Sequence, residues 1–415
     1  MAQEKLTMDE AIAIAVQNNH DLLIARNNTA IAEVDASLLN SGYLPNVTAS
    51  GGVSYSEETQ NVTFSDGNAT SIDGAVTESY NASVTAEYVL FDGMVRKFTQ
   101  DSNEANLSLT QVKERQAIEN TMIAVYENYF NVAFQQEVVH NLKVNLENSL
   151  DRLTRTKKNL KYGQGTYLDE LNAQVDLNTD SITYMEATRD LKNLKRNLNL
   201  VLGRDINQSY STDTTVVFAP AMEEARVWEA AKEKNVQLVL ASQNILISEL
   251  DIKISKAQFL PKISGSGSYR WNESQNPPTS FALNNEAYGV NLGLNVTWNL
   301  FNGSNTARVK KAKIQKMNRE IELAQLAYEV ETNVKNAYEN YTLSQYKLAA
   351  ERKNLETNQL NFARTQKQYS LAQITALEFR QAQINLFNAA NNVARAKFDL
   401  KIAEINLLQL MGSLL

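Results

Sequence analysis

The sequence predicts a mainly α-helical protein with a β-barrel contribution, in which a unit of one strand pair and one long helix is duplicated. Three observations predict this fold class. The chain repeats its motifs after about half of its 415 residues, each half has a very long stretch without Gly or Pro, and each half has two segments of strand periodicity.

The composition excludes several classes of function. A formal net charge of −7 and the lack of a basic block argue against a nucleic-acid partner. The absence of cysteine excludes disulfides, thiolate metal sites, a cysteine nucleophile and a lipid-bearing N-terminal cysteine. His20 and His140 lie far apart without carboxylate-rich surroundings, so we interpret both as ordinary helix residues. We therefore expect no metal and no cofactor.

Membrane and export signals of the helical kind are not visible. No segment approaches the roughly 18 consecutive apolar residues of a transmembrane helix, and Met1 to Lys5 show no hydrophobic signal core. We expect that any export signal was removed or was never present.

Ordered motif matches define the repeat. The Tyr-Leu-Pro of residues 43–45 returns as Phe-Leu-Pro at 259–261, Leu-Phe-Asp-Gly at 90–93 returns as Leu-Phe-Asn-Gly at 300–303, and Tyr-Glu-Asn-Tyr at 126–129 recurs at 338–341. From Asn145 onward the offset is 209, so that Gly203 matches Gly412. The chain therefore divides into repeat 1 (1–203), an inter-repeat equatorial linker (204–225) and repeat 2 (226–415).

Each repeat is predicted to have lead-in helices, two strands, a long helix and a return helix. Residues 94–162 and 304–411 contain neither Gly nor Pro. At a rise of 1.5 Å per residue, the first stretch makes a helix of about 100 Å. We expect long helices at about 93–162 and 303–369, and return helices at about 166–202 and 375–411.

Heptad spacing on the long helices predicts coiled-coil packing. The seams are Val125, Val132, Val139, Leu146, Leu153 and Leu160 on the first long helix and Val334, Tyr341, Leu348, Leu355, Phe362 and Tyr369 on the second. The last helix pairs a seam starting at Phe379 with one starting at Ala382, and alanine there permits close helix approach. The helices alone fit a filamentous or cytoplasmic coiled coil equally well.

The strands argue against that alternative. Residues of about 46–60, 79–91, 262–272 and 287–301 alternate between apolar and polar, most cleanly where Val290, Leu292 and Leu294 alternate with Asn291 and Gly293. Strands of about ten residues with Tyr or Trp at their ends are typical of a lipid-facing barrel. The candidate membrane-interface aromatics are Tyr55, Tyr80, Tyr88, Tyr269, Trp271, Tyr288 and Trp298.

Four strands cannot close a barrel alone. An open edge in hydrocarbon would leave backbone groups unpaired, so several chains must contribute, with eight strands from two chains or twelve from three. The polar segments Gln60 to Ser79 and Asn272 to Asn285 are expected to be exposed outer loops with mobile tips.

The turns between the long and return helices share one pattern. Thr166 with Asp169, and Thr375 with Glu378, fit an N-cap residue with a carboxylate in the first turn. Gly163 and Gly165 are expected to supply positive-φ residues to the first turn, whereas 369–373 has no glycine. In the linker, Val216 to Phe218 is a strand candidate and Pro220 marks the boundary of the halves.

Taken together, these motifs resemble the TolC-like outer-membrane efflux proteins over essentially the whole chain. The resemblance rests on Leu-Thr-Met-Asp-Glu-Ala at 6–11, the two Leu-Pro corners, the Phe-Asp-Gly and Phe-Asn-Gly helix starts and the Ala-Gln pairs of the return helices. No single motif is specific, but their order is. The family differs from this chain in often having Gly at position 372 and in often extending further than three residues beyond Gly412.

The resemblance implies a fold and a function. It implies a homotrimer with a twelve-stranded transmembrane barrel and an α-helical coiled-coil barrel, in the outer membrane of a Gram-negative-type bacterium and spanning into the periplasm. It implies a passive exit duct for tripartite drug efflux or type I secretion. The partners would be a periplasmic adaptor (membrane fusion protein) and an inner-membrane transporter, and the protein would have no chemistry of its own.

The resemblance also assigns roles to the hairpin ends. The family places acidic rings at the periplasmic entrance, and Glu378 and Gln381 match those positions, although the second is an amide here. Glu378 has the alternative role of capping partner to Thr375. The gate or bore candidates are Glu378, Gln381, Asn385, Asp169 and Asn172, and the adaptor-docking candidates are Gly163, Gln164, Gly165, Thr166, Tyr369, Leu371, Ala372, Gln373 and Thr375.

Three other classes of protein remain as alternatives. A trimeric coiled-coil adhesin or structural scaffold would share the heptads. A periplasmic adaptor would carry one hairpin rather than two. A secreted enzyme fits least, because no nucleophile, base and orienting group occur together in a recognisable motif.

Overall fold

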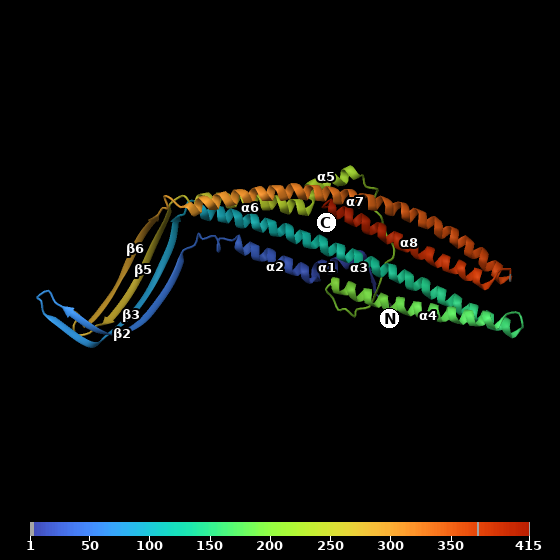
Figure 1. Cartoon of the computed structure of the whole chain (residues 1–415), viewed down its shortest axis with the longest axis horizontal. Coiled ribbons are helices and arrows are strands. Elements are labelled where there is room, and N and C mark those ends of the chain that lie inside the picture. Colours follow the sequence, from blue (N-terminus) through green and yellow to red (C-terminus); the bar gives the residue numbers. More distant parts are fainter. Residues whose placement is uncertain (1–3, 372, 415) are drawn as a thin grey trace. The chain divides into compact units, whose positions relative to one another are not determined.

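The same series of elements occurs twice along the chain. In a computed structural model of the protein, which describes residues 4–371 and 373–414, each half has two short helices, two strands, a long helix and a return helix (Figure 1). The helices are α1 (Met8–Asn18), α2 (His20–Asp35), α3 (Val95–Lys161), α4 (Tyr167–Val201), α5 (Glu224–Lys234), α6 (Val236–Ala257), α7 (Gly303–Ser370) and α8 (Ala376–Leu410). The bounds of the four longest agree with the predicted ones to within two residues.

Two compact units divide the chain, and each takes segments from both repeats. The helical unit comprises Met1–Asn28, Gln111–Ser242 and Glu322–Leu415, and the sheet unit comprises Thr29–Thr110 and Gln243–Ile321. The mainly helical fold with an antiparallel sheet confirms the predicted fold class. The long helices α3 and α7 contribute to both units, so the units do not coincide with the repeats.

Within the helical unit, side-chain contacts give the helix order α4, α3, α8, α7. Helix α3 contacts α4 through Ser149 and Asp180, whose oxygens lie 2.5 Å apart, and contacts α8 through Asn145 and Gln383, 2.7 Å apart. Helix α8 also packs on α7, where the ring of Phe379 stacks on Tyr369 with centroids 4.6 Å apart. The two return helices therefore have different neighbours.

Two apolar cores hold the helical unit together. The first joins α1, α3 and α4 to the start of the linker, and the second joins α5 and α6 to α7 and α8. Four residues of the predicted heptads, Val125, Val132, Val334 and Tyr341, are buried members of these cores. Burial of such side chains stabilises each by roughly 1.5–3 kcal/mol relative to exposure.

The linker contains a strand, but at a different position from the predicted one. Strand β4 (Tyr210–Thr212) pairs in parallel with β1 (Glu4–Leu6), whereas the predicted strand at Val216 to Phe218 is not a strand. Tyr210 is fully buried, and its hydroxyl donates to the carbonyl of Lys195. The pairing depends on a partner some 200 residues away in sequence, so local alternation could not reveal it.

Each return helix ends against the junction of its lead-in helices through a glycine. Gly203 and Gly412 have φ values of +66° and +64°. A Cβ atom on either would lie 2.3 Å or 2.2 Å from the carbonyl oxygen of Asn18 or Lys234. Only glycine allows both the left-handed backbone and this close approach.

The sheet unit contains four antiparallel strands. They are β2 (Asn46–Thr63), β3 (Ala69–Phe91), β5 (Lys262–Gln275) and β6 (Asn284–Thr297), in the spatial order β2-β3-β5-β6. The first predicted outer loop was too long, because β3 begins ten residues earlier than expected and pairs with β2 as far as Thr63 opposite Ala69. Backbone pairing continues there through polar residues that show no alternation. The second loop is also shorter, and residues 298–301 are not part of β6.

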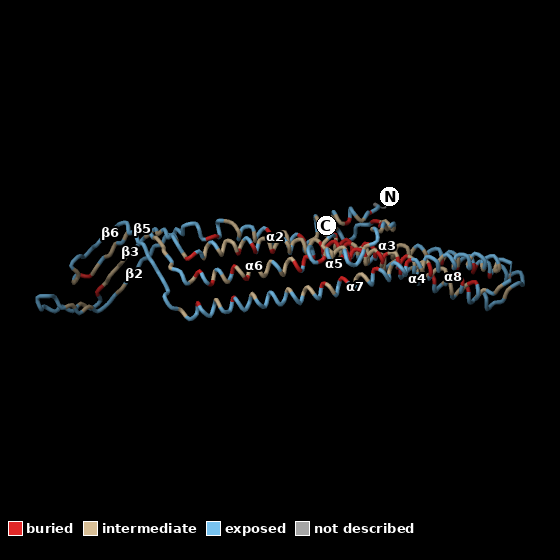
Figure 2. Tube along the Cα trace, turned by 90° about the horizontal axis from the view of Figure 1, so that it is seen from above, coloured by how far each residue is buried: buried red, intermediate tan, exposed pale blue. Residues whose placement is uncertain are grey.

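The register brings the predicted apolar positions of all four strands onto one face. One row across the sheet runs Ala49, Val84, Tyr269 and Val290. Figure 2 shows mostly exposed and intermediate residues along these strands, and Leu292 is 80% exposed. Among the described residues, no helix is both long and apolar enough to cross a membrane.

Candidate functional site

The first helical hairpin, between α3 and α4, turns on one glycine rather than two. Gly163 has φ +71°, its N–H donates to the carbonyl of Leu160 at 3.1 Å, and the N–H of Gln164 donates to Asn159 at 2.8 Å. This is the hydrogen-bond pattern of a left-handed helix terminus. Gly165 does not have a positive φ, so the prediction for that residue was wrong. Gly163, Gln164 and Thr166 are exposed, whereas Gly165 is half-buried.

The second hairpin, between α7 and α8, turns without a glycine. The N–H of Leu371 donates to Lys367 at 3.3 Å, and that of Gln373 donates to Gln368 at 2.9 Å. Leu371 and Gln373 are exposed, and Ala372 lies outside the described residues. Tyr369 is half-buried because its ring stacks on Phe379. Its aromatic ring therefore packs within the hairpin rather than projecting from it.

Both return helices begin with a capping box, as the sequence predicted. The hydroxyl of Thr166 accepts a hydrogen bond from the N–H of Asp169 at 3.2 Å, and Asp169 accepts one from the N–H of Thr166 at 3.1 Å. Thr375 and Glu378 make the same two bonds at the start of α8, at 3.3 Å and 2.8 Å. Two otherwise unpaired donors are thereby satisfied at each helix start.

The capping bonds lower the pKa of both carboxyl groups. For Asp169 the Thr166 hydroxyl is the main cause, followed by the Thr166 backbone N–H. For Glu378 the backbone N–H of Thr375 contributes most, followed by its hydroxyl. Both side chains are exposed and carry negative charge at neutral pH. The positive end of each helix dipole favours the same charge.

An exposed polar stripe continues from Glu378 along α8. Gln381, Asn385, Asn388 and Asn392 are exposed at alternating spacings of three and four, and the Gln381 amide donates to Asn385 at 2.8 Å. Beyond Asn392 the same helix face changes character. Arg395 lies over the ring of Phe134, 4.7 Å from its centroid, and Asp399 forms an ion pair with Lys347 at 3.7 Å.

A pocket between the first turns of α4 and α8 brings several predicted residues together. Its lining includes Asp169 and Asn172 from α4 and Thr375 from α8, with Arg152 and Arg380 at its polar wall. A second pocket, on the α7 side, is lined by Tyr369, Phe379 and Arg152 among others. The gate candidates of repeat 1 thus share a pocket with the docking candidate Thr375, while Tyr369 belongs to another pocket, and Glu378, Gln381 and Asn385 line neither of the two.

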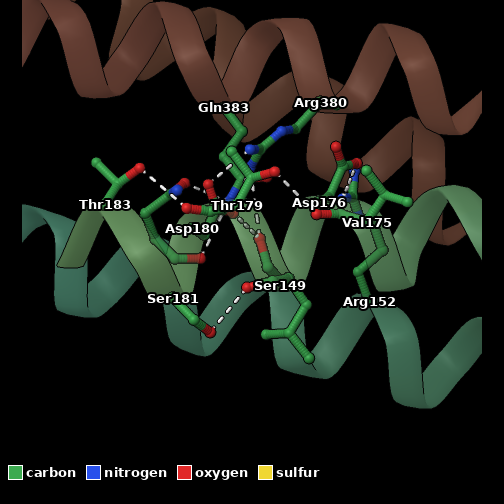
Figure 3. A network of polar contacts seen from close by, with 12 residues as sticks. Ser149, Arg152, Val175, Asp176, Thr179, Asp180, Ser181, Thr183, Arg380 and Gln383 are labelled. Carbon is green, nitrogen blue, oxygen red and sulfur yellow. Dashed lines mark hydrogen bonds and ion pairs between the residues drawn. The ribbon is translucent and has the colours of Figure 1, made fainter. Parts of the chain in front are cut away.

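Beside these pockets lies a buried charged cluster that the sequence reasoning missed. The guanidinium of Arg380 donates to both carboxylate oxygens of Asp180, at 2.9 Å and 2.7 Å, and Ser149 donates to Asp180 at 2.5 Å (Figure 3). Arg152 pairs with Asp176 one turn away. The sequence contains a sign of this cluster. The polar residues Asn145, Ser149, Arg152 and Thr156 are spaced by four and three along α3, which is the spacing of residues on a buried helix face.

The sheet places the seven predicted aromatics in three positions. Trp271 lies opposite Tyr288 and Ala82, with Tyr80 and Tyr55 one and two rows further toward the outer loops. Tyr88 lies near the other end of the strands, where Trp298 directly follows β6, and Tyr269 lies between the two groups. The side chains of Tyr55, Tyr80 and Trp271 each donate a hydrogen bond to a glutamate, Glu57, Glu78 and Glu286 respectively.

Comparison with known proteins agrees with this architecture. The profile of the outer membrane efflux protein family matches residues 11–204 and 227–413, one match in each repeat. The chain is 21% identical over 325 residues to the outer membrane protein TolC of Vibrio cholerae, covering 76% of this chain and 74% of that protein.

Two further relatives extend the comparison. The alkaline protease secretion protein AprF of Pseudomonas aeruginosa is 20% identical over 330 residues, covering 78% of this chain and 67% of its own length. The crystal structure of the Campylobacter jejuni CmeC outer membrane channel superposes with a TM-score of 0.81 at 14% identity, covering 98% of this chain and 86% of that one. These relatives are channels and secretion proteins, which agrees with the prediction that the chain is not an enzyme.

Proposed function

Because the chain belongs to the outer membrane efflux protein family, we propose that three copies form one channel that serves as a passive exit duct. The channel would span the outer membrane and reach into the periplasm. The observation that carries the proposal is a four-stranded sheet with one exposed apolar face and with β2 and β6 as its edges. An apolar face can contact lipid without burying unpaired polar groups. The edge strands can form backbone hydrogen bonds with the edge strands of other copies of the chain.

The strand directions support closure by copies of the same chain. All three neighbouring pairs are antiparallel, so β6 of one copy and β2 of the next would also run antiparallel. A closed barrel built from any number of these four-strand units has an even number of strands and no unpaired edge strand. The family resemblance selects three units and twelve strands. A coiled-coil adhesin or scaffold would leave this sheet without a role.

The hairpin tips are the proposed docking surface for a periplasmic adaptor, which would connect the duct to an inner-membrane transporter. Gly163, Gln164, Leu371 and Gln373 present backbone, two amide side chains and one exposed apolar side chain, and none of them carries a charge, which suits contact with another helix hairpin. The name of AprF indicates protease secretion, and the name of the family indicates efflux. Drug efflux and type I secretion are both compatible with this surface.

Electron microscopy of the detergent-solubilised oligomer tests the proposal. We expect particles of three chains with a continuous central lumen, and single-channel conductance after insertion into planar bilayers. A solid fibre, or a water-soluble monomer with full secondary structure, would contradict it. Export measured in a host that lacks its own channel, with the partner pump supplied, separates an efflux duct from a closed pore.

A further inference from the structure

Charge is distributed unequally between the two ends of the sheet unit. At the end where β2 joins β3 and β5 joins β6, residues 55–80 and 270–288 contain seven acidic residues and one basic residue. At the end where the strands meet the helices, residues 90–99, 250–264 and 298–313 contain nine basic and two acidic residues. The two ends therefore carry opposite net charge, and the helix end is strongly basic.

The basic charge is concentrated at the start of α7. From Gly303 to Arg319 this helix has six basic residues and no acidic residue, whereas residues 95–111 at the start of α3 have two of each. The excess of positive charge is thus a property of repeat 2 and not of long helices in general. The four basic residues nearest to the sheet are all exposed, and we call them the basic patch: Arg308, Lys310, Lys311 and Lys313.

The lysines of the basic patch are not neutralised within the chain. Among the residues that the structure describes, Lys310, Lys311 and Lys313 form no ion pair. Lys316, further along the same helix, differs because it pairs with Glu249 at 3.0 Å. Three neighbouring exposed lysines without a carboxylate create a positive local potential, which favours an anionic partner.

The start of α7 is held so that these lysines stay accessible. Asn305 and Ala312 are buried, and the amide of Asn305 donates to the carbonyl of Gln258 at 3.3 Å. At about 3.6 residues per turn, the three lysines are spread over the side of the helix opposite to Asn305 and Ala312. Whichever part of that side faces outward from a channel therefore has a lysine close to it.

An exposed apolar segment lies immediately before the basic patch. Trp298, Leu300 and Phe301 directly follow β6 and are 58%, 79% and 91% exposed. The indole N–H of Trp298 donates to the carbonyl of Phe259 at 3.0 Å, which fixes the ring beside the turn between α6 and β5. Exposed apolar and aromatic side chains followed within about ten residues by lysines are typical of a segment that passes from hydrocarbon into the headgroup layer.

The spacing along the chain suits the headgroup layer. This layer adds roughly 5–8 Å to each side of the hydrocarbon core. Helix α7 begins at Gly303, so a rise of about 1.5 Å per residue places Arg308 about 8 Å and Lys311 about 12 Å further along the helix. The long stems of arginine and lysine let their charges reach back toward the membrane surface. The basic patch is therefore at the depth where lipid phosphates lie.

We propose that the basic patch binds the anionic headgroups of phospholipids in the leaflet that faces the periplasm. Clusters of about four to eight Lys or Arg next to a membrane-spanning segment bind anionic lipids in this way. The acidic end of the sheet repels the same headgroups, so the contact also favours one orientation of the chain across the membrane. The inference rests on the proposed outer-membrane channel. It adds a lipid class, a leaflet and the residues that recognise the headgroup.

Native mass spectrometry with two lipids tests the contact on the unaltered protein. The solubilised, delipidated protein is mixed with phosphatidylglycerol or with phosphatidylcholine of the same acyl chains, so that the two lipids differ in headgroup charge. We expect more bound phosphatidylglycerol than phosphatidylcholine at equal concentration. Added salt should abolish the difference, because it screens charges at the surface. Equal binding of the two lipids at low salt would overturn the proposal.

A triple variant tests the assignment to the basic patch. Lys310→Gln/Lys311→Gln/Lys313→Gln should lower phosphatidylglycerol binding by at least about fivefold, the change expected for one lysine near an anionic surface. Its phosphatidylcholine binding should equal that of the parent. The matched control Lys157→Gln/Lys158→Gln/Lys161→Gln removes the same charge from exposed lysines of α3 near the first hairpin and should bind both lipids as the parent does. An equal loss in the two variants, or no loss in the first, would exclude the patch.

Inorganic phosphate distinguishes a lipid partner from a free anion. At the concentration of the lipid, phosphate should leave the bound phosphatidylglycerol in place, because it lacks the acyl chains that contact the apolar segment. Displacement of the lipid by phosphate would show that the patch binds a free anion and would overturn the lipid assignment.

The results separate the lipid contact from the proposed function. A trimer that conducts but binds the two lipids equally would overturn the lipid contact and leave the duct standing. A protein that prefers phosphatidylglycerol through the basic patch but neither forms a trimer nor conducts would support the lipid contact and contradict the duct. A monomer without a lipid preference would overturn both.

Discussion

The backbone N–H of Thr375 donates to Oε2 of Glu378 at 2.8 Å, while the hydroxyl of Thr375 accepts a hydrogen bond from the N–H of Glu378 at 3.3 Å. Glu378 is therefore a structural residue at the start of α8 as well as the proposed charge at the channel entrance. The two roles depend on different properties of the side chain. The cap needs an acceptor oxygen, and the entrance needs a negative charge.

Replacing Glu378 by Gln keeps the acceptor and removes three charges per trimer. We expect lower cation selectivity and weaker divalent-cation block in planar bilayers, with little change in the melting temperature. The control Thr375→Ala removes the cap and should cost about 1 kcal/mol of stability. An unchanged conductance profile, or a stability loss equal to that of Thr375→Ala, would show that Glu378 is only a cap.

Bulk at the hairpin tip should block export without disturbing assembly. A Cβ on Gly165 would lie 3.4 Å from Cβ of Asn159, an ordinary contact, and its φ is not left-handed. Gly165→Ala should therefore export normally, whereas Gly165→Trp should abolish export with the trimer and its conductance intact. A bulky residue at Leu371 should act similarly. Normal export by the tryptophan variant would argue against docking at this tip.

A charge on the apolar sheet face should prevent membrane assembly. Lysine at a lipid-facing barrel position near the bilayer midplane costs about 2–4 kcal/mol. Leu292→Lys should therefore reduce the amount of folded trimer in the outer membrane. Asn291→Lys, its neighbour on the opposite face of β6, is the matched control and should assemble normally. Equal assembly of the two variants would show that lipid does not cover this face.

Tyr129 should make the helical unit sensitive to alkali. Its buried hydroxyl donates to the carbonyl of Leu6 at 2.8 Å and accepts from the N–H of Asp213 at 2.9 Å. Burial raises the pKa of Tyr129 from 10.0 to about 12. The folded state binds this proton more tightly than the unfolded state does. Its contribution to stability is therefore complete below pH 10 and is lost as pH rises toward 12.

The variant Tyr129→Phe checks this assignment. It leaves the Leu6 carbonyl and the Asp213 N–H without their partner, at a cost of roughly 1–3 kcal/mol for each buried group. Thermal unfolding followed by circular dichroism should show a lower midpoint at neutral pH and a smaller fall between pH 10 and 12. Tyr210, Tyr126 and Tyr341, whose pKa values are also raised by burial, should contribute to the remaining fall. An unchanged alkaline fall would exclude Tyr129 as its source.

The sequence by itself determined the long helices and their caps. An uninterrupted stretch without Gly or Pro fixes the extent of α3, and such a stretch fixes the start of α7. The Thr166 and Thr375 motifs fix where the return helices start. These features are set by neighbours within about four residues along the chain, so a local pattern contains the necessary information. Strand periodicity and the duplication were visible for the same reason.

Only the tertiary structure decided which elements meet. The parallel pairing of β4 with β1, the extension of β3 through polar residues, and the pairing of Asp180 with Arg380 all join positions that carry no local signal of their partner. From sequence alone, a charged residue on a helix is predicted to be solvent-exposed unless its partner is known. The helix order α4, α3, α8, α7 supplies that partner for one repeat. The physical reason is that burial and pairing depend on contacts between residues distant in sequence, whereas helix and strand period depend on the backbone alone.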